Sequence, residues 1–177
     1  EIHERLVGSE MCIRDRALTM LPEQIHLVIV GRHTEYTDKI ERFIKENKLE
    51  ERVHIISNVP FDDLPAFYQL AEIFVYPSRF EGFGIPIIEA LYSGIPVVAA
   101  TGSCLEEAGG PDSIYVHPDD IKGMADAFKQ IYSDTERKKE MIEKGQKFAK
   151  RFSEEKQAEE ILTIYKKLMK WTYLNIQ

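Results

Sequence analysis

The chain has 177 residues, of which 44% are hydrophobic and 30% charged, so it is long enough for one compact domain with its own core. A formal net charge of −7 argues against a nucleic-acid partner, because surfaces that bind nucleic acid are basic. No apolar run reaches the roughly 18 residues that span a bilayer, and no signal peptide is visible. Cys12 and Cys104 stand alone, which argues against disulfides or zinc and favours a reducing, cytoplasmic location.

Residues 1–16 fit poorly with the rest of the chain. The stretch from Val7 to Arg16, VGSEMCIRDR, has neither a helical nor a strand period. It resembles translated sequencing-adapter read-through, which belongs outside any fold, and it is equally compatible with a natural, irregular N-terminal segment. Both interpretations stay open, and we expect the folded domain to comprise residues 17–177.

Five short apolar runs predict the strands of a buried sheet. Runs of this kind, bounded by turn residues, are typical of parallel strands that are covered on both faces. They are His26–Val30, Val53–Ile56, Ile73–Tyr76, Pro96–Ala100 and Ser113–Val116.

Helices are predicted between and after these strands. Pro65 and Pro86 suit the first turns of two of them, and Gly94 suits a helix end. The predicted helices cover about 37–49, 62–71, 86–93, part of 101–110, 120–131, 134–151 and 153 onward. Aspartates able to cap N-termini are Asp62 and Asp63, Asp119 or Asp120, and Asp134. The last helix has an apolar stripe formed by Ile161, Ile164, Tyr165 and Leu168.

Buried strands that alternate with helices predict an α/β domain with a parallel sheet. In such a sheet ligands bind beyond the carboxyl ends of the strands. Four loops should therefore form one rim. They follow Gly31, include Ser57 and Asn58, run from Ser78 to Gly84, and include Thr101 and Gly102.

The loop EGFGI, Glu81 to Ile85, lies on this rim between a predicted strand and a predicted helix. Amides from Phe83 to Ile85 would point toward a ligand above the helix, whose N-terminus carries about half a positive charge. A phosphate is the favoured guest, and glycine at positions 82 and 84 lets the backbone approach it closely. The alternative is that Gly82 and Gly84 only make a tight turn.

Two glutamates flank the loop. Glu89 lies about one turn into an apolar helix, and a carboxylate there must reach solvent or hydrogen-bond donors. The vicinal hydroxyls of a ribose are suitable donors, and the alternative is a solvated glutamate that complements the helix dipole. Glu81 precedes the turn, where it could contact a polyol or stabilise developing positive charge, or be an ordinary surface residue.

Basic residues near the rim give a weaker indication of an anion. Arg32 directly follows Gly31, and its guanidinium suits phosphate oxygens, whereas His33 and Arg79 are as compatible with solvated positions. A nicotinamide site is not indicated, because only GRHTEY follows the first strand, and no Walker A loop is present.

The segment EGFGIPIIEALYSGIPVVA resembles the E-x7-E motif of retaining glycosyltransferases of family 4 (group 1), which have the GT-B fold. The flanking segments agree with that family in order. They are HLVIVGR, RVHIISNV, LAEIFVYPS, LEEAGG and VHPDD, so that the resemblance covers roughly Pro22 to Lys170. The resemblance implies a Rossmann-like parallel sheet flanked by helices, the C-terminal, donor-binding half of a GT-B fold.

The family's functional residues transfer to matching positions of this chain. Glu81 would lie near the transferred sugar as the catalytic residue, and Glu89 would hold the ribose hydroxyls. The remaining donor-binding positions implied by the resemblance or by the rim are Gly82, Phe83, Gly84, Ile85, Arg32, Asn58 and Val59. No metal or other cofactor is expected, because in the family basic side chains and the helix dipole neutralise the leaving diphosphate.

The chain departs from the family in two respects. The domain's first strand, which in the family precedes an arginine and lysine that grip the diphosphate, is missing or replaced by the segment before Arg16. The N-terminal acceptor domain of the parent is absent too, and it is the part that would carry any peripheral membrane association. The domain is therefore expected to be incomplete at its N-terminus and inactive in isolation.

These features together predict a hexosyltransferase as the full-length parent. It would transfer a sugar from a UDP- or GDP-sugar to a glycan or lipid-linked acceptor with retention of configuration. The alternative function is a non-catalytic module that binds a nucleotide-sugar.

Overall fold

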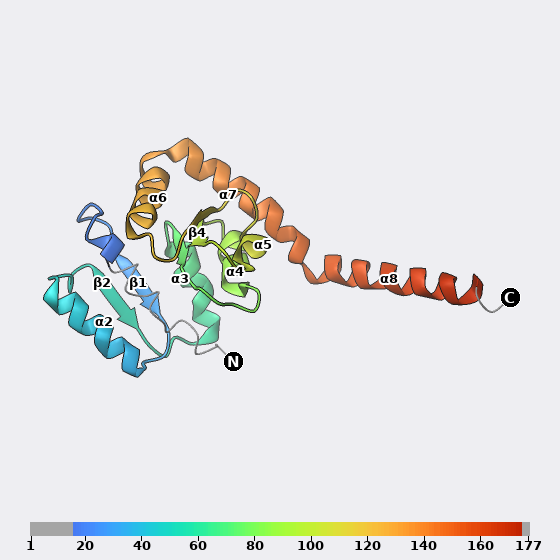
Figure 1. Ribbon diagram of the computed structural model, residues 1–177, viewed down its shortest axis with the longest axis horizontal. Coiled ribbons are helices and arrows are strands. Elements are labelled where there is room, and N and C mark those ends of the chain that lie inside the picture. Colours follow the sequence, from blue (N-terminus) through green and yellow to red (C-terminus); the bar gives the residue numbers. More distant parts are fainter. Residues whose placement is uncertain (1–15, 175–177) are drawn as a thin grey trace.

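Strands and helices alternate along residues 16–174, the part of the chain that the computed structural model describes (Figure 1). The side chains of Tyr36 and of residues 170–174 lie outside that description, as does the predicted irregular segment 1–16 apart from Arg16. The predicted α/β class is confirmed. Within residues 16–174 no helix has both the length and the apolar character needed to cross a membrane.

All five predicted strands are present, and each begins within one residue of its predicted start. They are β1 (Leu27–Val30), β2 (Val53–Ile56), β3 (Phe74–Tyr76), β4 (Val97–Ala100) and β5 (Ile114–Val116). Every pairing among them is parallel. The valines, isoleucines and other apolar residues of these runs favour strands because they pack well on a pleated surface. Burial on both faces, which was predicted for all five strands, holds throughout β4, whereas Val28 of β1 and His54 of β2 are exposed.

The strands form two sheets where one was predicted. One sheet pairs β1 with β2, and the other has the order β3-β4-β5, with no ladder between β1 and β3 among the described residues. An apolar run shows that a strand is buried, but it does not specify which strand edges meet, and the prediction of a single sheet was wrong for that reason.

The helices follow the predicted order. They are α2 (Glu35–Glu46), α3 (Leu64–Leu70), α4 (Ile85–Tyr92), α5 (Leu105–Gly109), α6 (Ile121–Ser133), α7 (Thr135–Ala149) and α8 (Glu154–Leu174). Short 3-10 turns at Phe61–Asp63 and Lys150–Phe152 precede α3 and α8. The prolines lie in the first turns of α3 and α4, as predicted, and Gly94 follows α4 with a φ of 76°.

Two of the predicted caps form, and one does not. The carboxylate of Asp120 accepts a hydrogen bond from the Gly123 amide at 2.8 Å, and that of Asp134 accepts one from the Arg137 amide at 2.9 Å. Asp63 occupies the N-cap position of α3, but its side chain accepts no cap bond. Its backbone is already α-helical because a 3-10 turn leads directly into α3, whereas a capping side chain works from an extended residue.

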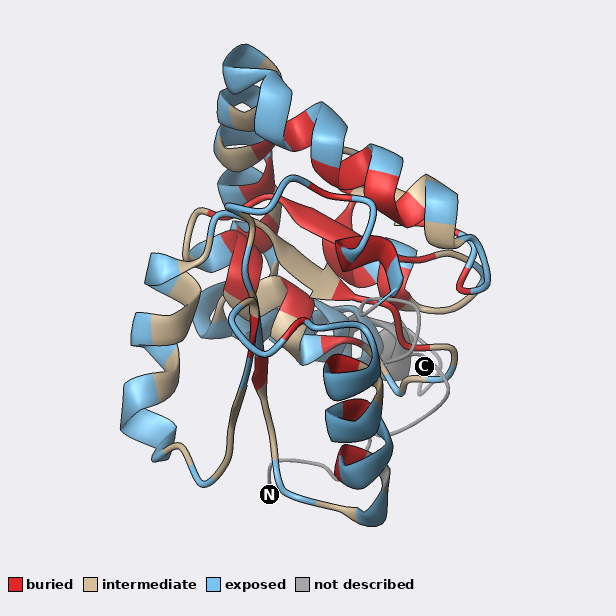
Figure 2. Cartoon of the chain, turned by 90° about the vertical axis from the view of Figure 1, so that its left-hand side faces the viewer, coloured by how far each residue is buried: buried red, intermediate tan, exposed pale blue. Residues whose placement is uncertain are grey.

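Two apolar clusters form the interior, and β4 contributes to both. Figure 2 shows the buried residues in red, on strands and on parts of the helices packed against them. Val98 belongs to the cluster that α2 and α6 cover, together with Ile29 of β1, so this cluster spans both sheets. Val97 and Ala99 belong to the cluster covered by α4 and α5. The two sheets are therefore held together by packing, although no hydrogen-bond ladder among residues 16–174 joins them.

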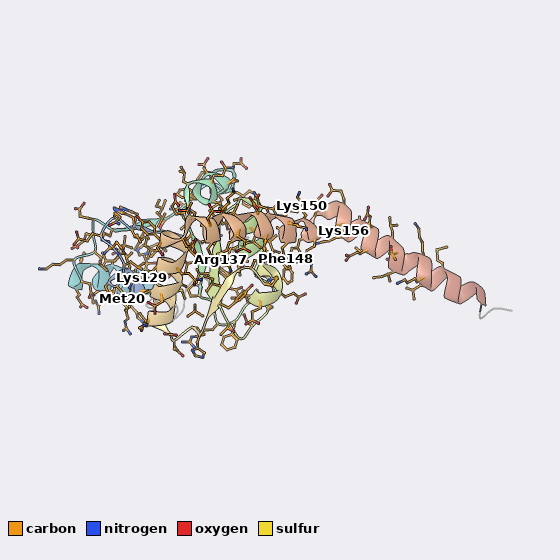
Figure 3. All side chains as sticks on the ribbon, turned by 90° about the horizontal axis from the view of Figure 1, so that it is seen from above. Met20, Lys129, Arg137, Phe148, Lys150 and Lys156 are labelled. Atoms are coloured by element: carbon orange, nitrogen blue, oxygen red, sulfur yellow. The ribbon has the colours of Figure 1, made fainter. Side chains whose placement is uncertain are left out.

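The last helix, α8, projects from the body of the molecule (Figures 1 and 3). It contacts the 3-10 turn Lys150–Phe152 at its beginning and extends away from there. The predicted apolar stripe is present but is not buried, since Ile161, Ile164 and Leu168 are 53–57% exposed. A helical period shows which side chains share a face, and it does not show whether a partner covers that face.

Candidate functional site

The turn between β3 and α4 is built as a helix N-terminus with unpaired amides. Gly84 is the N-cap residue of α4 and has a φ of 102°. Among the described residues, the amides of Phe83, Gly84 and Ile85 donate to no other residue, while the Ile87 amide bonds the Gly84 carbonyl at 3.0 Å. Unpaired amides at the positive end of a helix favour an anionic or hydroxyl-rich ligand.

The two glycines of the turn are present for different reasons. A Cβ on Gly84 would approach Leu105 Cδ2 to 2.9 Å, and its left-handed φ disfavours any other residue, so the fold itself requires glycine there. Gly82 has no positive φ, and a Cβ would meet nothing within 4 Å. Packing and backbone geometry therefore do not explain Gly82, which leaves room for a ligand's approach as its role.

Glu81 is held by three groups from different parts of the chain. Its Oε1 accepts hydrogen bonds from the Tyr76 hydroxyl and the Ser78 hydroxyl, each at 2.8 Å. Its backbone carbonyl accepts one from the Cys104 thiol at 3.1 Å, which ties the turn to the residue before α5. The half-buried carboxylate thus has a defined position at the end of β3.

Glu89 is also held by a tyrosine. The Tyr68 hydroxyl of α3 donates to Glu89 Oε2 at 2.8 Å. Burial, and then the charge of Glu89, raise the pKa of Tyr68 well above its ordinary value of 10.0, so the hydroxyl stays protonated and keeps donating at neutral pH. The hydrogen bond from Tyr68 therefore explains in part how an apolar helix accommodates this half-buried carboxylate.

Arg79, which the sequence offered as a candidate for pairing with an anionic ligand, pairs with a carboxylate of the chain itself. Its guanidinium pairs with the carboxylate of Asp119, which lies in the loop after β5. This hydrogen bond and the positive charge hold the pKa of Asp119 below its usual range. The pair joins the loops after β3 and β5, and the loop after β5 was not one of the four loops predicted to form the rim.

The other three predicted donor-binding residues follow the strands of the β1-β2 sheet. Arg32 and Asn58 are exposed beyond the ends of β1 and β2, and Val59 is half-buried beside Asn58. Asn58 has a φ of 59°, a left-handed conformation that asparagine tolerates. No hydrogen bond or ion pair within residues 16–174 joins any of the three to the turn 81–89. Their roles stay predictions.

Sequence reasoning missed the hydroxyl groups that hold the two glutamates. For Tyr76 and Ser78 a signal existed, because one ends a strand that is otherwise apolar and the other lies in the loop that follows, five and three positions before Glu81. For Tyr68 no local signal existed, since it is 21 positions from Glu89 and reaches it only through the fold.

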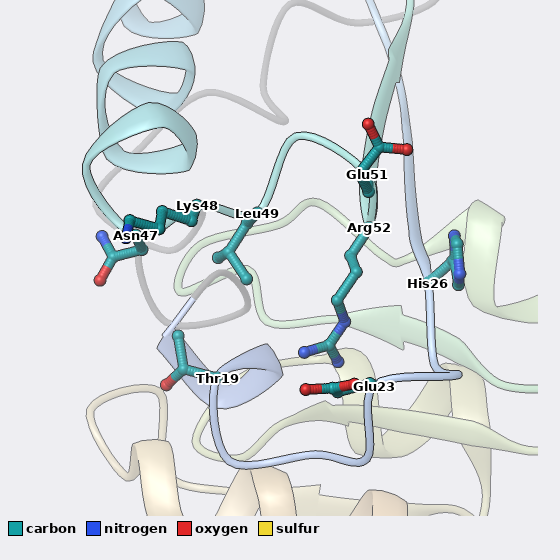
Figure 4. Close-up of a pocket in the computed structure, with 8 residues that line it drawn as sticks. All are labelled: Thr19, Glu23, His26, Asn47, Lys48, Leu49, Glu51 and Arg52. Atoms are coloured by element: carbon teal, nitrogen blue, oxygen red, sulfur yellow. The ribbon is translucent and has the colours of Figure 1, made fainter.

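A hollow of about 510 Å³ lies at the other end of the strands (Figure 4). It includes His26 before β1 and Arg52 before β2, on the edge opposite the turn 81–89. The Arg52 guanidinium donates to backbone carbonyls, among them that of Pro22 at 2.9 Å and that of Ile25 at 3.1 Å. This arginine secures the segment before β1, and the hollow contributes nothing to the candidate site.

The fold and the turn define a class of protein: a parallel α/β domain whose candidate binding groups gather where β3, an edge strand of its sheet, passes into α4. The chain belongs to the family of glycosyl transferases group 1, whose model matches residues 15–148. It is 31% identical over 142 residues to O-antigen chain mannosyltransferase B of Escherichia coli. It is 34% identical over 170 residues to D-inositol 3-phosphate glycosyltransferase of Corynebacterium aurimucosum.

The chain spans less than half the length of these two relatives. The matches cover 80% and 92% of this chain but only 37% and 40% of the relatives. Within residues 16–174 no group of three or more histidine, cysteine, aspartate or glutamate side chains is arranged to hold a metal ion.

Solved structures share the fold. A glycosyltransferase from Rickettsia africae matches with a TM-score of 0.83 at 22% identity, covering 94% of this chain and 46% of that one. HepE of Anabaena in complex with UDP matches with a TM-score of 0.75 at 23% identity, covering 92% and 44%. The C-terminal domain of LpcC, a group 1 glycosyl transferase of Francisella tularensis, matches with 0.72 at 22% identity, covering 85% and 81%. The predicted fold class, the C-terminal half of a GT-B glycosyltransferase, is confirmed.

Proposed function

We propose that this chain is the donor-binding half of a retaining family 4 glycosyltransferase that takes a hexose from a UDP- or GDP-sugar. One observation carries the proposal: three unpaired amides at the start of α4 lie between two carboxylates, Glu81 and Glu89, that hydroxyl groups hold in place. Amides suit the oxygens of a diphosphate, and carboxylates suit the hydroxyls of a sugar and a ribose.

The relatives support the same chemistry. HepE binds UDP and UDP-glucose in its solved structures, and two of the curated relatives are mannosyltransferases of O-antigen chains. In this proposal Glu89 binds the ribose, and Glu81 lies beside the sugar as the catalytic residue. Gly82 to Ile85 surround the diphosphate sugar, Arg32 pairs with phosphate oxygens, and Asn58 and Val59 lie against the base.

The parent protein would supply what this chain lacks. The relatives are more than twice as long as the matched region, which leaves room for an acceptor domain. The break between β1 and β3 is where one further parallel strand would complete a single sheet, with its following basic residues directed at the diphosphate. The transferase activity, the glycan or lipid-linked acceptor and the retention of configuration belong to that parent.

Calorimetric titration of the chain with UDP, GDP, UDP-glucose and GDP-mannose tests the proposal. We expect one nucleotide and its sugar to bind, and Glu89→Gln to weaken both about tenfold, because a charge-assisted bond to the ribose is lost. With the matching 2′,3′-dideoxy nucleotide the two proteins should bind equally. Glu143→Gln, an exposed glutamate of α7, is the matched control and should change nothing.

Two results would contradict this function. The first is that none of the four ligands binds to the unchanged chain. The second is near-normal sugar transfer by the full-length parent carrying both Glu81→Ala and Glu89→Ala, which would remove these residues from the site.

A further inference from the structure

Tyr76 and Ser78 present an unusual pair of buried hydroxyl groups. They are 5% and 4% exposed, and a buried hydroxyl needs a hydrogen-bond partner. Both donate to the same atom, Glu81 Oε1, at 2.8 Å, one from the last residue of β3 and one from the loop that follows. The Ser78 hydroxyl also lies 3.5 Å from the Phe80 carbonyl oxygen, which is a longer contact than its bond to Glu81. Both hydroxyls thus have a 2.8 Å bond to the carboxylate proposed to lie beside the sugar.

The two bonds give the two oxygens of the Glu81 carboxylate different surroundings. Oε1 accepts both hydroxyls, while Oε2 accepts no hydrogen bond from any residue in 16–174. A carboxylate fixed at one oxygen by two charge-assisted bonds loses the freedom to rotate and offers the other oxygen in one direction. The Cys104 thiol bond to the Glu81 carbonyl fixes the backbone of the same residue.

The surrounding chain makes this arrangement rigid. Tyr76 packs in the apolar cluster of α4 and α5, and its ring stacks on Phe74 at 5.9 Å between centroids. Its hydroxyl is thus held by a packed side chain of a strand. A group that must act on one ligand atom benefits from such support, because misplacement by about 1 Å can cost a hundredfold in rate.

We propose that Tyr76 and Ser78 are positioning residues that engage Glu81 Oε1 and so aim Oε2 at a hydroxyl of the donor sugar. The inference rests on the proposed function, since it needs a nucleotide-sugar at the turn. It predicts that the two hydroxyls matter for the sugar part of the donor and not for the nucleotide part. A purely structural role would affect both parts, or stability alone.

Calorimetry on the whole chain separates these roles. Tyr76→Phe and Ser78→Ala should each weaken binding of the UDP-glucose or GDP-mannose donor about three- to tenfold, while binding of the matching UDP or GDP stays within about twofold. In a double-mutant cycle, Tyr76→Phe should have no further effect on the donor once Glu81→Ala has removed the acceptor of its hydrogen bond. Ser133→Ala, an exposed hydroxyl at the end of α6, is the control and should leave both affinities unchanged.

The results distinguish this inference from the proposed function. Equal losses for nucleotide and nucleotide-sugar, or additive effects of Tyr76→Phe and Glu81→Ala, would overturn the positioning role and leave donor binding intact. Equal affinity of the unchanged chain for UDP-glucose and UDP, and for GDP-mannose and GDP, would also overturn it. No binding of either kind of ligand would contradict the proposed function itself. Thermal unfolding of each variant identifies any loss that comes from unfolding.

Discussion

At the scale of single residues, the candidate site depends on hydroxyl groups that keep two carboxylates in place. Tyr68 and Tyr76 are not expected to react with a ligand themselves, and their value lies in the direction that they give to Glu89 and Glu81. A glutamate at the end of a strand or in the first turns of a helix has several rotamers, and each hydroxyl selects among them. The site is therefore more ordered than its exposed turn suggests.

The two glycines of the turn give a prediction with a built-in control. Gly84→Ala should destabilise the chain by about 1–3 kcal/mol, because alanine strains at a φ of 102° and crowds Leu105. Gly82→Ala should leave stability within about 0.5 kcal/mol and still weaken donor binding. Urea unfolding and calorimetry measure the two effects. Equal destabilisation by both variants would show that the positive φ and the Leu105 contact of Gly84 do not determine its effect on stability.

A second residue-scale prediction concerns alkaline pH. Burial raises the pKa of Tyr115 to about 12, whereas an unfolded tyrosine titrates near 10. The unfolded chain loses this proton first, so the contribution to stability is complete below pH 10 and falls between about pH 10 and 12. Urea unfolding of the chain and of Tyr115→Phe across this range should show a steeper decline for the unchanged chain. Identical slopes would contradict the prediction.

At the scale of elements, side-chain caps set where α6 and α7 begin. Asp120→Ala and Asp134→Ala should each destabilise the chain by about 0.5–2 kcal/mol, because each removes a bond to an otherwise unpaired amide. Asp63→Ala is the matched control, since Asp63 lies at the N-cap position of α3 without a cap bond. Urea unfolding measures all three, and a cost for Asp63→Ala as large as for the others would refute this explanation.

The elements themselves were largely predictable from sequence. The run Val53–Ile56 predicted a strand, although only Val53 in it is buried, and Pro86 and Gly94 mark the two ends of α4 through local backbone chemistry. The pairing of strands was not predictable, because it depends on contacts between residues far apart in the chain. The turn and its two glutamates followed from spacing, whereas the bond from Tyr68 to Glu89 required the fold.

At the scale of the whole molecule, two apolar clusters form the interior, one of them spans both sheets, and α8 lies outside both clusters. Substitutions on α8 should therefore cost less stability than substitutions in the buried interior. Ile164→Gln and Leu168→Gln on α8 should change stability by less than about 0.5 kcal/mol, because both side chains are mostly exposed. Ile131→Ala, at a fully buried position of α6, should cost about 2–5 kcal/mol. Urea unfolding measures each variant, and a large cost on α8 would mean that its stripe is covered in solution.

The projection of α8 has a consequence for how the molecule opens. Within residues 16–174, the main contact of α8 with the body is the one with the 3-10 turn Lys150–Phe152. A helix held mainly at one end gains little from tertiary packing, so its hydrogen bonds are protected mainly by helix formation itself. Its amides should exchange with deuterium in local openings long before those of β4, which open only when the whole core does. A protease would find its first cleavage sites along the same helix.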